Sequence, residues 1–217
     1  TGKKVNRFTH IHQSIEDLVN KVKMMRMIAQ KTGTCFQRCV GFDAMNATFI
    51  TTYNMDKKYG TNYHERFKKW MTYVQENDLM IAGAMTDVKG NRSLKPSKQA
   101  DPDLFTHVVE KREDGVIICG AKAHMTGMAN SHEMLILPTT NLLDGDQDYA
   151  IACAVPVDAE GITHIFGRQT NDQRRLQGDL DTGTSEYAIV GGETLTVLDH
   201  VFVPWDRVFM CGEVDFA

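Results

Sequence analysis

The sequence predicts an α+β protein, with a helical region over about residues 1–78 followed by a β-rich region over about residues 79–217. In the first third of the chain, apolar residues recur at the spacing of amphipathic helices. From Leu79 onward, short β-rich apolar runs are separated by Gly, Asp, Asn and Pro. Regularly spaced strands of this kind are typical of an all-β barrel or sandwich, so we expect a helical domain followed by a β domain.

The first helix is expected in SIEDLVNKVKMMRMIAQKTG, residues 14–33. Ser14 is a suitable N-cap, Asp17 three residues later makes a near capping box, and Gly33 is expected to end the helix. The apolar residues at helical spacing are Ile15, Leu18, Val19, Val22 and Met25.

Two more helices are expected before the β-rich region. The second runs from about Thr34 to about Tyr53 and carries two cysteines. The third starts near Asn62, has Glu65 in its first turn and runs to Glu76.

The strands are expected in five runs of the β-rich region. These runs are DGVIICGAKAHM, HEMLILP, DYAIACAVPV, ITHIFGRQ and TLTVLDHVFVPWDRVFM. The sequence contains no internal repeat and no low-complexity segment.

Composition argues against several classes of protein. The 217 residues carry a net charge of -4 with no basic stripe, which argues against a nucleic-acid partner. No apolar run approaches the ~20 residues that cross a bilayer, so no membrane partner is expected. The five cysteines are too sparse for a secreted disulfide framework, which favours a cytoplasmic protein with reduced thiols. Because the sequence starts at Thr1 rather than Met and stops at GEVDFA, we expect a piece of a longer chain.

Cys35 and Cys39 lie one helical turn apart in TCFQRCVGFDAMNATF, residues 34–49. On a helix such a pair shares one face, with Cβ atoms about 5–6 Å apart. Two thiolates so placed could ligate zinc or one edge of an iron–sulfur cluster, each of which needs about four ligands. Three alternatives stay open at this point: buried cysteines that act as small hydrophobes, a metal site, or a redox disulfide.

The segment AMTDVKGNRSLKPS, residues 84–97, contains a turn at Gly90 and Asn91 with Lys89 and Arg92 on either side. The two cations, the Thr86 hydroxyl and exposed backbone N–H groups could surround a phosphate. The segment matches neither a Walker loop nor a Rossmann fingerprint. The alternative is a solvated polar loop.

The segment GAKAHMTGMANSHEM, residues 120–134, is rich in small residues and hydrogen-bonding groups. His124 and Thr126 are expected on one side of a strand and Met125 on the other. Gly127 would allow close approach of a ligand, so the segment could position a flat cofactor. His124 and His132 could instead ligate a metal, and a polar β-turn-β segment is the alternative without a ligand.

Glu193 follows Gly191 and Gly192 and begins an apolar run. Two glycines permit an unusual approach of the backbone, and a carboxylate at this place could be a buried acid or base. The alternative is an exposed carboxylate at a strand edge.

Taken together, these segments resemble a known family. LDHVFVPWDRVF resembles the strand–turn–strand that closes the middle β-domain of flavin-dependent acyl-CoA dehydrogenases and their relatives. The segments NRFTHIHQSIEDLVNKVKMMRMIAQKTGTCFQRCVGFDAMNATF, KYGTNYHERF, QENDLMIAGAMTDVKGNR, DPDLF, VEKREDG and GAKAHMTGMANSHEM are similar, one after another, to the 4-hydroxybutyryl-CoA dehydratases (vinylacetyl-CoA Δ-isomerases). The wider family includes flavin-dependent 4-hydroxyphenylacetate monooxygenases, which generally lack the cysteine pair.

The resemblance implies a fold, cofactors and an activity. The fold would be a helical N-terminal portion followed by a β-barrel middle domain of acyl-CoA dehydrogenase type, with the C-terminal helical bundle absent from this sequence. The cofactors would be FAD and a [4Fe–4S] cluster held by three Cys and one His. The reactions would be dehydration of 4-hydroxybutyryl-CoA to crotonyl-CoA and isomerisation of vinylacetyl-CoA, in a homotetramer completed by the rest of the chain or a second polypeptide.

The resemblance also implies roles for individual residues. Cys35 and Cys39 match the first two cluster ligands, whereas Cys211 does not match the third, which is expected beyond Ala217 together with the His ligand. The residues that match FAD contacts are Met85, Thr86, Asp87, Val88, Lys89, Gly90, Asn91, Arg92, His124, Met125 and Thr126. The catalytic candidates are Thr126, at the reactive edge of the flavin ring, and Gln37 and Glu193, which match polar residues lining the active site.

Two other functions are weighed against this one. The first is an FAD-dependent aromatic monooxygenase of the 4-hydroxyphenylacetate type, in which Cys35 and Cys39 merely pack. The second is a binding module without enzymatic activity, stabilised by zinc or by thiols. Iron content and flavin absorbance would distinguish the three.

Overall fold

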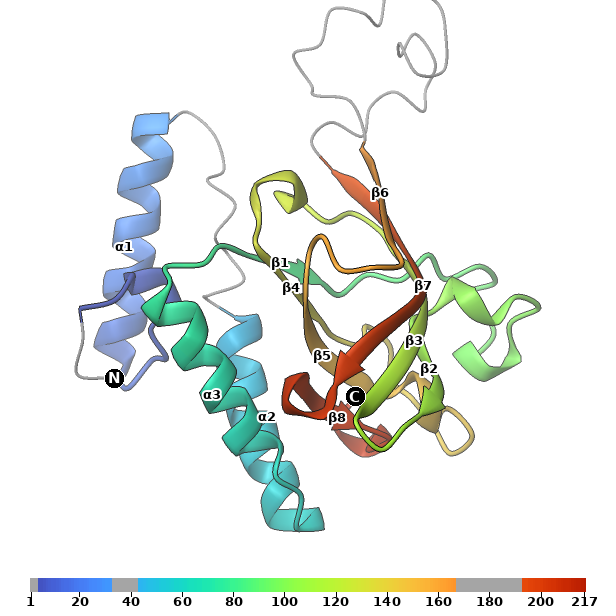
Figure 1. Cartoon of the computed structure of the whole chain (residues 1–217). Coiled ribbons are helices and arrows are strands. Elements are labelled where there is room, and N and C mark those ends of the chain that lie inside the picture. Colours follow the sequence, from blue (N-terminus) through green and yellow to red (C-terminus); the bar gives the residue numbers. More distant parts are fainter. Residues whose placement is uncertain (1–3, 33–42, 167–192) are drawn as a thin grey trace, which may run out of the picture.

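The computed structural model describes residues 4–32, 43–166 and 193–217 (Figure 1). Its helices are α1 (Ile15–Thr32), α2 (Ala44–Tyr59) and α3 (Tyr63–Glu76). Its strands are β1 (Ile81–Ala84), β2 (His107–Lys111), β3 (Gly115–Lys122), β4 (Glu133–Ile136), β5 (Ile151–Pro156), β6 (Ile162–Phe166), β7 (Thr194–Pro204) and β8 (Val208–Cys211). The order of elements confirms the predicted change from helices to strands near residue 78, while the division into two domains stays a prediction.

Helix α1 begins where the sequence predicts. The Ser14 hydroxyl oxygen accepts a hydrogen bond from the Asp17 backbone N–H at 3.1 Å, as expected of an N-cap. Gly33, the predicted end of this helix, lies outside the described residues.

Helix α2 ends later than the predicted Tyr53 and continues to Tyr59. Gly60 has a left-handed backbone (φ 66°), and its N–H donates to the Asp56 carbonyl at 2.9 Å. A left-handed glycine is a common helix terminator, and the sequence analysis missed this stop signal. The predicted start of the helix at Thr34 lies outside the described residues.

Helix α3 begins next to the predicted Asn62, but a different residue caps it. The Asn62 side chain makes no capping hydrogen bond. The Asp56 carboxylate instead accepts from the backbone N–H groups of Tyr63 at 2.8 Å and His64 at 3.0 Å, and from the Thr61 hydroxyl at 2.6 Å. The last turn of α2 therefore caps α3 and sets the angle between the two helices.

The described strands form two four-stranded sheets. The first sheet has the order β1-β4-β5-β8, in which β1 and β4 are parallel and the other pairs are antiparallel. The second sheet has the order β2-β3-β7-β6 and is antiparallel throughout. Each of the five predicted runs contributes at least one strand. The sheets are hydrogen-bonded separately in the described part of the chain, so a closed barrel stays a prediction.

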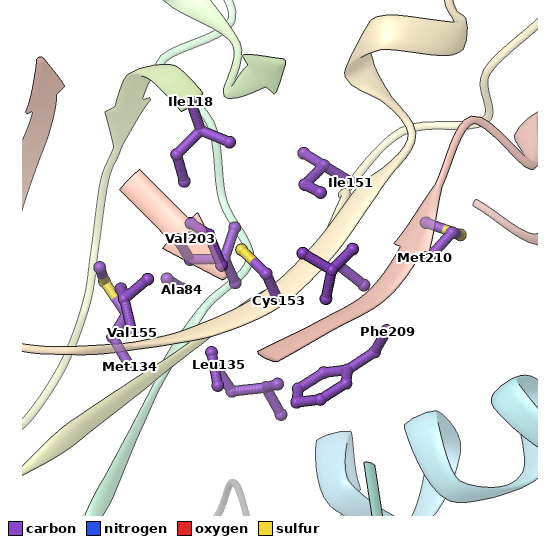
Figure 2. Packing of buried hydrophobic residues seen from close by; sticks show 14 of the residues in the cluster. Ala84, Ile118, Met134, Leu135, Ile151, Cys153, Val155, Val203, Phe209 and Met210 are labelled. Atoms are coloured by element: carbon purple, nitrogen blue, oxygen red, sulfur yellow. The ribbon is translucent and has the colours of Figure 1, made fainter. Parts of the chain in front are cut away.

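The first sheet is buried on both faces, which explains why its strands are almost continuously apolar. Figure 2 shows Ile118 and Val203 of the second sheet close to Cys153 of β5. On the other face, the Phe209 ring of β8 lies 5.1 Å from the Phe67 ring of α3. One core therefore joins the second sheet, the first sheet and the α2–α3 pair (Figure 1).

The helices do not resemble membrane spans. Among the described residues, no helix combines the length and the hydropathy needed to cross a bilayer.

The cap of α3 provides a test of this arrangement. We expect Asp56→Ala to lower the free energy of unfolding by about 1–2 kcal/mol, because the first N–H groups of α3 lose their acceptor. The matched control is Asn62→Ala, which occupies the nominal cap position and should change stability by less than about 0.5 kcal/mol. Urea denaturation followed by circular dichroism measures both; an equal loss in the two variants would contradict the assignment.

Candidate functional site

The two segments predicted to contact a cofactor lie side by side, where β1 and β3 end. The backbone N–H of Ala123 donates to the Thr86 carbonyl at 2.7 Å, and Asp87 and Lys122 form an isolated antiparallel bridge. The structure therefore joins loop 85–92 to residues 122–126, which lie at least thirty positions further along the sequence.

A buried ion pair fastens this junction. Lys122 Nζ lies 2.7 Å from Asp87 Oδ1, and the two side chains are 1% and 4% exposed. The ammonium also donates to the carbonyls of Met85 and Leu137, both at 2.9 Å. Burial lowers the pKa of Lys122, and the neighbouring Asp87 carboxylate opposes that shift. Removing one partner of such a pair costs about 3–5 kcal/mol, because the other charge stays buried alone.

Within loop 85–92, Asp87 is the one buried residue, and its neighbours are exposed or half-buried. Asp87 points inward, whereas Met85 and Val88 are 44% and 42% exposed. Two large apolar side chains held at the surface on either side of a buried anchor offer an apolar face to a ligand.

The turn that follows is held in place by Gln99. Lys89 (φ 77°) and Gly90 (φ 46°) both have left-handed backbones. The hydrogen-bonded turn lies one residue later than the predicted Gly90–Asn91, because the Leu94 N–H donates to the Asn91 carbonyl at 3.1 Å. A Cβ at Gly90 would come within 2.4 Å of Leu104 Cδ1. The Gln99 side chain accepts from the Asn91 N–H at 3.0 Å and donates to the Asn91 carbonyl at 2.8 Å. Lys89 and Arg92 have no ion-pair partner among the described residues, so their charges are available to an anion.

Residues 124–126 follow β3 rather than lie within it, but their directions are as predicted. His124 and Thr126 are exposed, and Met125 is 1% exposed. The Met125 N–H donates to the Thr194 carbonyl at 3.1 Å, which ties this segment to the start of β7. His124 has a left-handed backbone (φ 58°), a conformation that a non-glycine residue rarely adopts.

Glu193 meets the same segment. The Thr126 hydroxyl donates to Glu193 Oε1 at 2.7 Å, and His124 Nδ1 lies 3.8 Å from Glu193 Oε2. The Glu193 side chain is 29% exposed, so it is neither the buried nor the fully exposed carboxylate that the sequence left open. A hydroxyl, an imidazole and a carboxylate thus converge on the segment that is joined to loop 85–92 through Lys122 and Ala123.

An apolar cavity of 140 Å³ opens beside Met85, between α2 and the first sheet. Its wall on α2 consists of Ala47, Thr48, Thr51, Thr52 and Met55. Met85 and Leu137 line the opposite side, so loop 85–92 borders this cavity through Met85.

The predicted metal ligands Cys35 and Cys39, with Gln37 between them, lie outside the described residues. The described cysteines are core residues. Burial raises the pKa of Cys153 to about 12 and also raises the pKa of Cys211, so both are protonated thiols at neutral pH.

Cys119 lies next to two further potential ligands, Asp199 and His200. Its sulfur already accepts the His200 backbone N–H at 3.2 Å, and Asp199 Oδ1 lies 2.6 Å from His200 Nδ1. Burial raises the pKa of Cys119 as well. These groups already have hydrogen-bond partners among themselves at a bulge of β7, and we assign no metal to them.

His132 is likewise engaged within the protein. Its Nδ1 accepts the Met80 backbone N–H at 3.1 Å, where β1 and β4 come together. The alternative in which His124 and His132 ligate a metal has no further support among the described residues.

Comparison with known protein families shows to which family the chain belongs. The model of the 4-hydroxyphenylacetate 3-hydroxylase N-terminal family matches residues 1–210. The chain belongs to this family. Within the family, the chain is 55% identical over 218 aligned positions to the 4-hydroxybutyryl-CoA dehydratase/vinylacetyl-CoA-Δ-isomerase of Clostridium aminobutyricum, which confirms the predicted resemblance. That alignment covers 100% of the chain and 44% of the relative, so the chain spans less than half of it.

Solved structures agree with this membership of the 4-hydroxyphenylacetate 3-hydroxylase family. The chain superposes with a TM-score of 0.90 and 55% identity on an oxygen-tolerant archaeal 4-hydroxybutyryl-CoA dehydratase from N. maritimus, covering 100% of the chain and 43% of that structure. The oxygenase component of a 4-hydroxyphenylacetate 3-monooxygenase complexed with FAD superposes with a TM-score of 0.74 at 25% identity, covering 99% of the chain and 43% of that structure.

The sequence analysis missed Lys122, the residue that joins the two predicted segments. One signal was present, because Lys122 is the only charged residue in the run GVIICGAKA. A lysine in a buried strand is rare unless it is paired.

Proposed function

We propose that this chain is the flavin-binding part of a 4-hydroxybutyryl-CoA dehydratase that also isomerises vinylacetyl-CoA. The observation that carries the proposal is 55% identity along the whole chain to an enzyme of that name. Relatives named as 4-hydroxyphenylacetate monooxygenases are only 30% identical over 81% and 69% of the chain. The substrates would be 4-hydroxybutyryl-CoA and vinylacetyl-CoA, and the product crotonyl-CoA.

The residues present fit a bound FAD. A flavin needs an apolar surface for its ring, polar groups at the ring edge and cations for its pyrophosphate. Met85 and Val88 would supply the apolar surface, Thr126 the polar edge, and Lys89 and Arg92 the positive charge. The FAD complex of the monooxygenase component, which shares this fold, supports the assignment.

The family resemblance implies that Cys35 and Cys39 would be cluster ligands. A cluster binds thiolates, whereas burial raises the pKa values of the Cys153 and Cys211 thiols. Cys35 and Cys39 supply at most two of about four ligands, so other polypeptide must supply the rest. A homotetrameric assembly and a cytoplasmic location, both implied by the family resemblance, remain proposals.

The proposed reaction needs bond activation and proton transfer, and the side chains of this site would take part in the proton transfer. When bound, FAD would supply one-electron chemistry at the unreactive C3–H bond, and a cluster iron would act as a Lewis acid toward the C4 hydroxyl. Isomerisation moves a proton from C2 to C4, so it needs a group that accepts a proton and returns it. Glu193 would be this group, and the hydrogen bond from the Thr126 hydroxyl to its carboxylate supports that role. Gln37 would line the same active site.

The alternative is a flavin-dependent aromatic monooxygenase, favoured by the fold shared with the FAD complex of that enzyme. The two functions differ in their need for oxygen. The deciding experiment incubates the anaerobically purified holoenzyme with 4-hydroxybutyryl-CoA and follows crotonyl-CoA by liquid chromatography. We expect crotonyl-CoA to form without oxygen. Absence of that product, together with oxygen-dependent hydroxylation of 4-hydroxyphenylacetate by the enzyme with reduced FAD, would replace the proposal with the alternative.

Iron content provides a separate test. The holoenzyme should contain about four iron and four sulfide per chain, and Cys35→Ala should lose most of both because a cluster ligand is missing. Cys211→Ala is the matched control and should keep its iron, because that half-buried thiol lies at the end of β8 and does not match a cluster ligand. Iron analysis and electron paramagnetic resonance report the result. Full iron in Cys35→Ala would remove Cys35 from the ligand set.

The Thr126–Glu193 pair provides a third test. Glu193→Gln should lower kcat for isomerisation by about 10²–10⁴-fold, since the amide cannot accept the proton. Thr126→Val should lower kcat less, because the carboxylate is misoriented but still present. Thr72→Val is the control, since the exposed Thr72 hydroxyl only donates to Lys68 within α3. Steady-state kinetics with vinylacetyl-CoA at equal flavin content measures all three; an unchanged kcat in Glu193→Gln would exclude the proton-transfer role.

A further inference from the structure

The Lys122 ammonium has three protons and three acceptors. It contacts Asp87 Oδ1 at 2.7 Å and the carbonyls of Met85 and Leu137 at 2.9 Å each. None of these groups donates a proton to it. A neutral amine would carry only two protons for three acceptors, so the geometry requires the charged form.

The Asp87 carboxylate is equally engaged. Besides Lys122, its Oδ1 accepts the Thr106 backbone N–H at 3.0 Å, and its Oδ2 accepts the Thr139 hydroxyl at 2.9 Å. Asp87 therefore cannot turn outward to a ligand without breaking contacts to three separate segments. Its place in the predicted FAD-contacting segment must have another explanation.

We propose that Lys122 is a positioning residue for the flavin, which it never touches, because its ammonium sets the conformation of loop 85–92. The proposal rests on the proposed function, since it assumes that this loop and residues 124–126 bind FAD. Lys122 lies two residues before His124. Its ammonium binds the Met85 carbonyl and the Asp87 carboxylate of the other segment. It thus determines the spacing between the apolar face of Met85 and Val88 and the Thr126 hydroxyl.

The charge and hydrogen bonds of the Lys122 ammonium, rather than the volume of its side chain, account for this role. Methionine has nearly the same length and apolar stem as lysine, so Lys122→Met would fill the space. It would leave the Met85 and Leu137 carbonyls without their buried donor and the Asp87 carboxylate without its counter-charge. Loop 85–88 would then relax toward solvent and lose the arrangement of exposed side chains that the flavin needs.

A double variant separates positioning from general stability. Asp87→Asn combined with Lys122→Met removes both charges and so relieves the unpaired carboxylate. Stability should recover partly, but the Met85 and Leu137 carbonyls still lack their donor. FAD affinity should therefore stay weak in the double variant, whereas a purely structural role predicts that affinity returns with stability.

The chain offers a matched control in Lys21 of α1. Lys21 is also fully buried and donates to two backbone carbonyls, those of Phe8 at 3.3 Å and His10 at 2.8 Å. These two contacts lie in the N-terminal helical region rather than at loop 85–92. Lys21→Met removes a comparable buried ammonium and should destabilise the protein without weakening FAD binding.

The experiment removes FAD from the purified protein and titrates it back, following flavin fluorescence and the visible circular dichroism of the bound ring. We expect the dissociation constant to rise at least tenfold, or about 1.4 kcal/mol, in Lys122→Met and in the double variant. The value for Lys21→Met should equal that of the wild type. Thermal unfolding of the FAD-free proteins is measured in parallel.

The outcomes distinguish this proposal from the proposed function. If the wild type itself fails to bind FAD, the proposed function fails. If the wild type binds FAD and folded Lys122→Met binds it with unchanged affinity and an unchanged circular dichroism spectrum, the positioning role is overturned. Affinity restored in the double variant, or lost equally in Lys21→Met, would also overturn it. Should Lys122→Met not fold, the double variant compared with Lys21→Met decides.

Discussion

The buried ion pair between Asp87 and Lys122 is the constraint on which the candidate site depends. It lies where β1 and β3 leave their different sheets, and it is the place where those sheets are tied together by charge. The exposed side chains of the site lie within a few residues of this pair in sequence. Met85 and Val88 flank Asp87, and His124 and Thr126 follow Lys122. A surface arranged for a ligand is thus supported by a core interaction that the ligand does not reach.

The layered core explains why the pair can exist. The first sheet is covered by α3 on one face and by the second sheet on the other, so its end is sealed from water. In such a place an ion pair is tolerated only if its hydrogen bonds are complete. The Met85 and Leu137 carbonyls complete those of Lys122, and the Thr106 N–H and Thr139 hydroxyl complete those of Asp87.

Local signals predicted much of the fold, and long-range contacts account for what they missed. The Ser14 N-cap and the helical spacing of apolar residues in α1 are signals within one segment. The apolar runs that form strands are signals of the same kind. Lys122 reaches acceptors 37 and 15 positions away, which no pattern within one segment reveals. The contact between Thr126 and Glu193 spans 67 positions, and local features singled out each residue without predicting that the two meet. Gly60 was a local signal that the analysis overlooked.

The fold alone does not separate dehydratase from monooxygenase, because a fold can host several functions. The exposed face of loop 85–92 and the Thr126 edge suit a flavin in either enzyme. The proposed iron cluster would depend on Cys35 and Cys39, since burial raises the pKa values of the Cys153 and Cys211 thiols and keeps them protonated. The described residues therefore argue for the flavin, and identity along the chain, 55% to a dehydratase, argues for the reaction. The two arguments are independent, because one rests on side chains of the described residues and the other on identity along the chain.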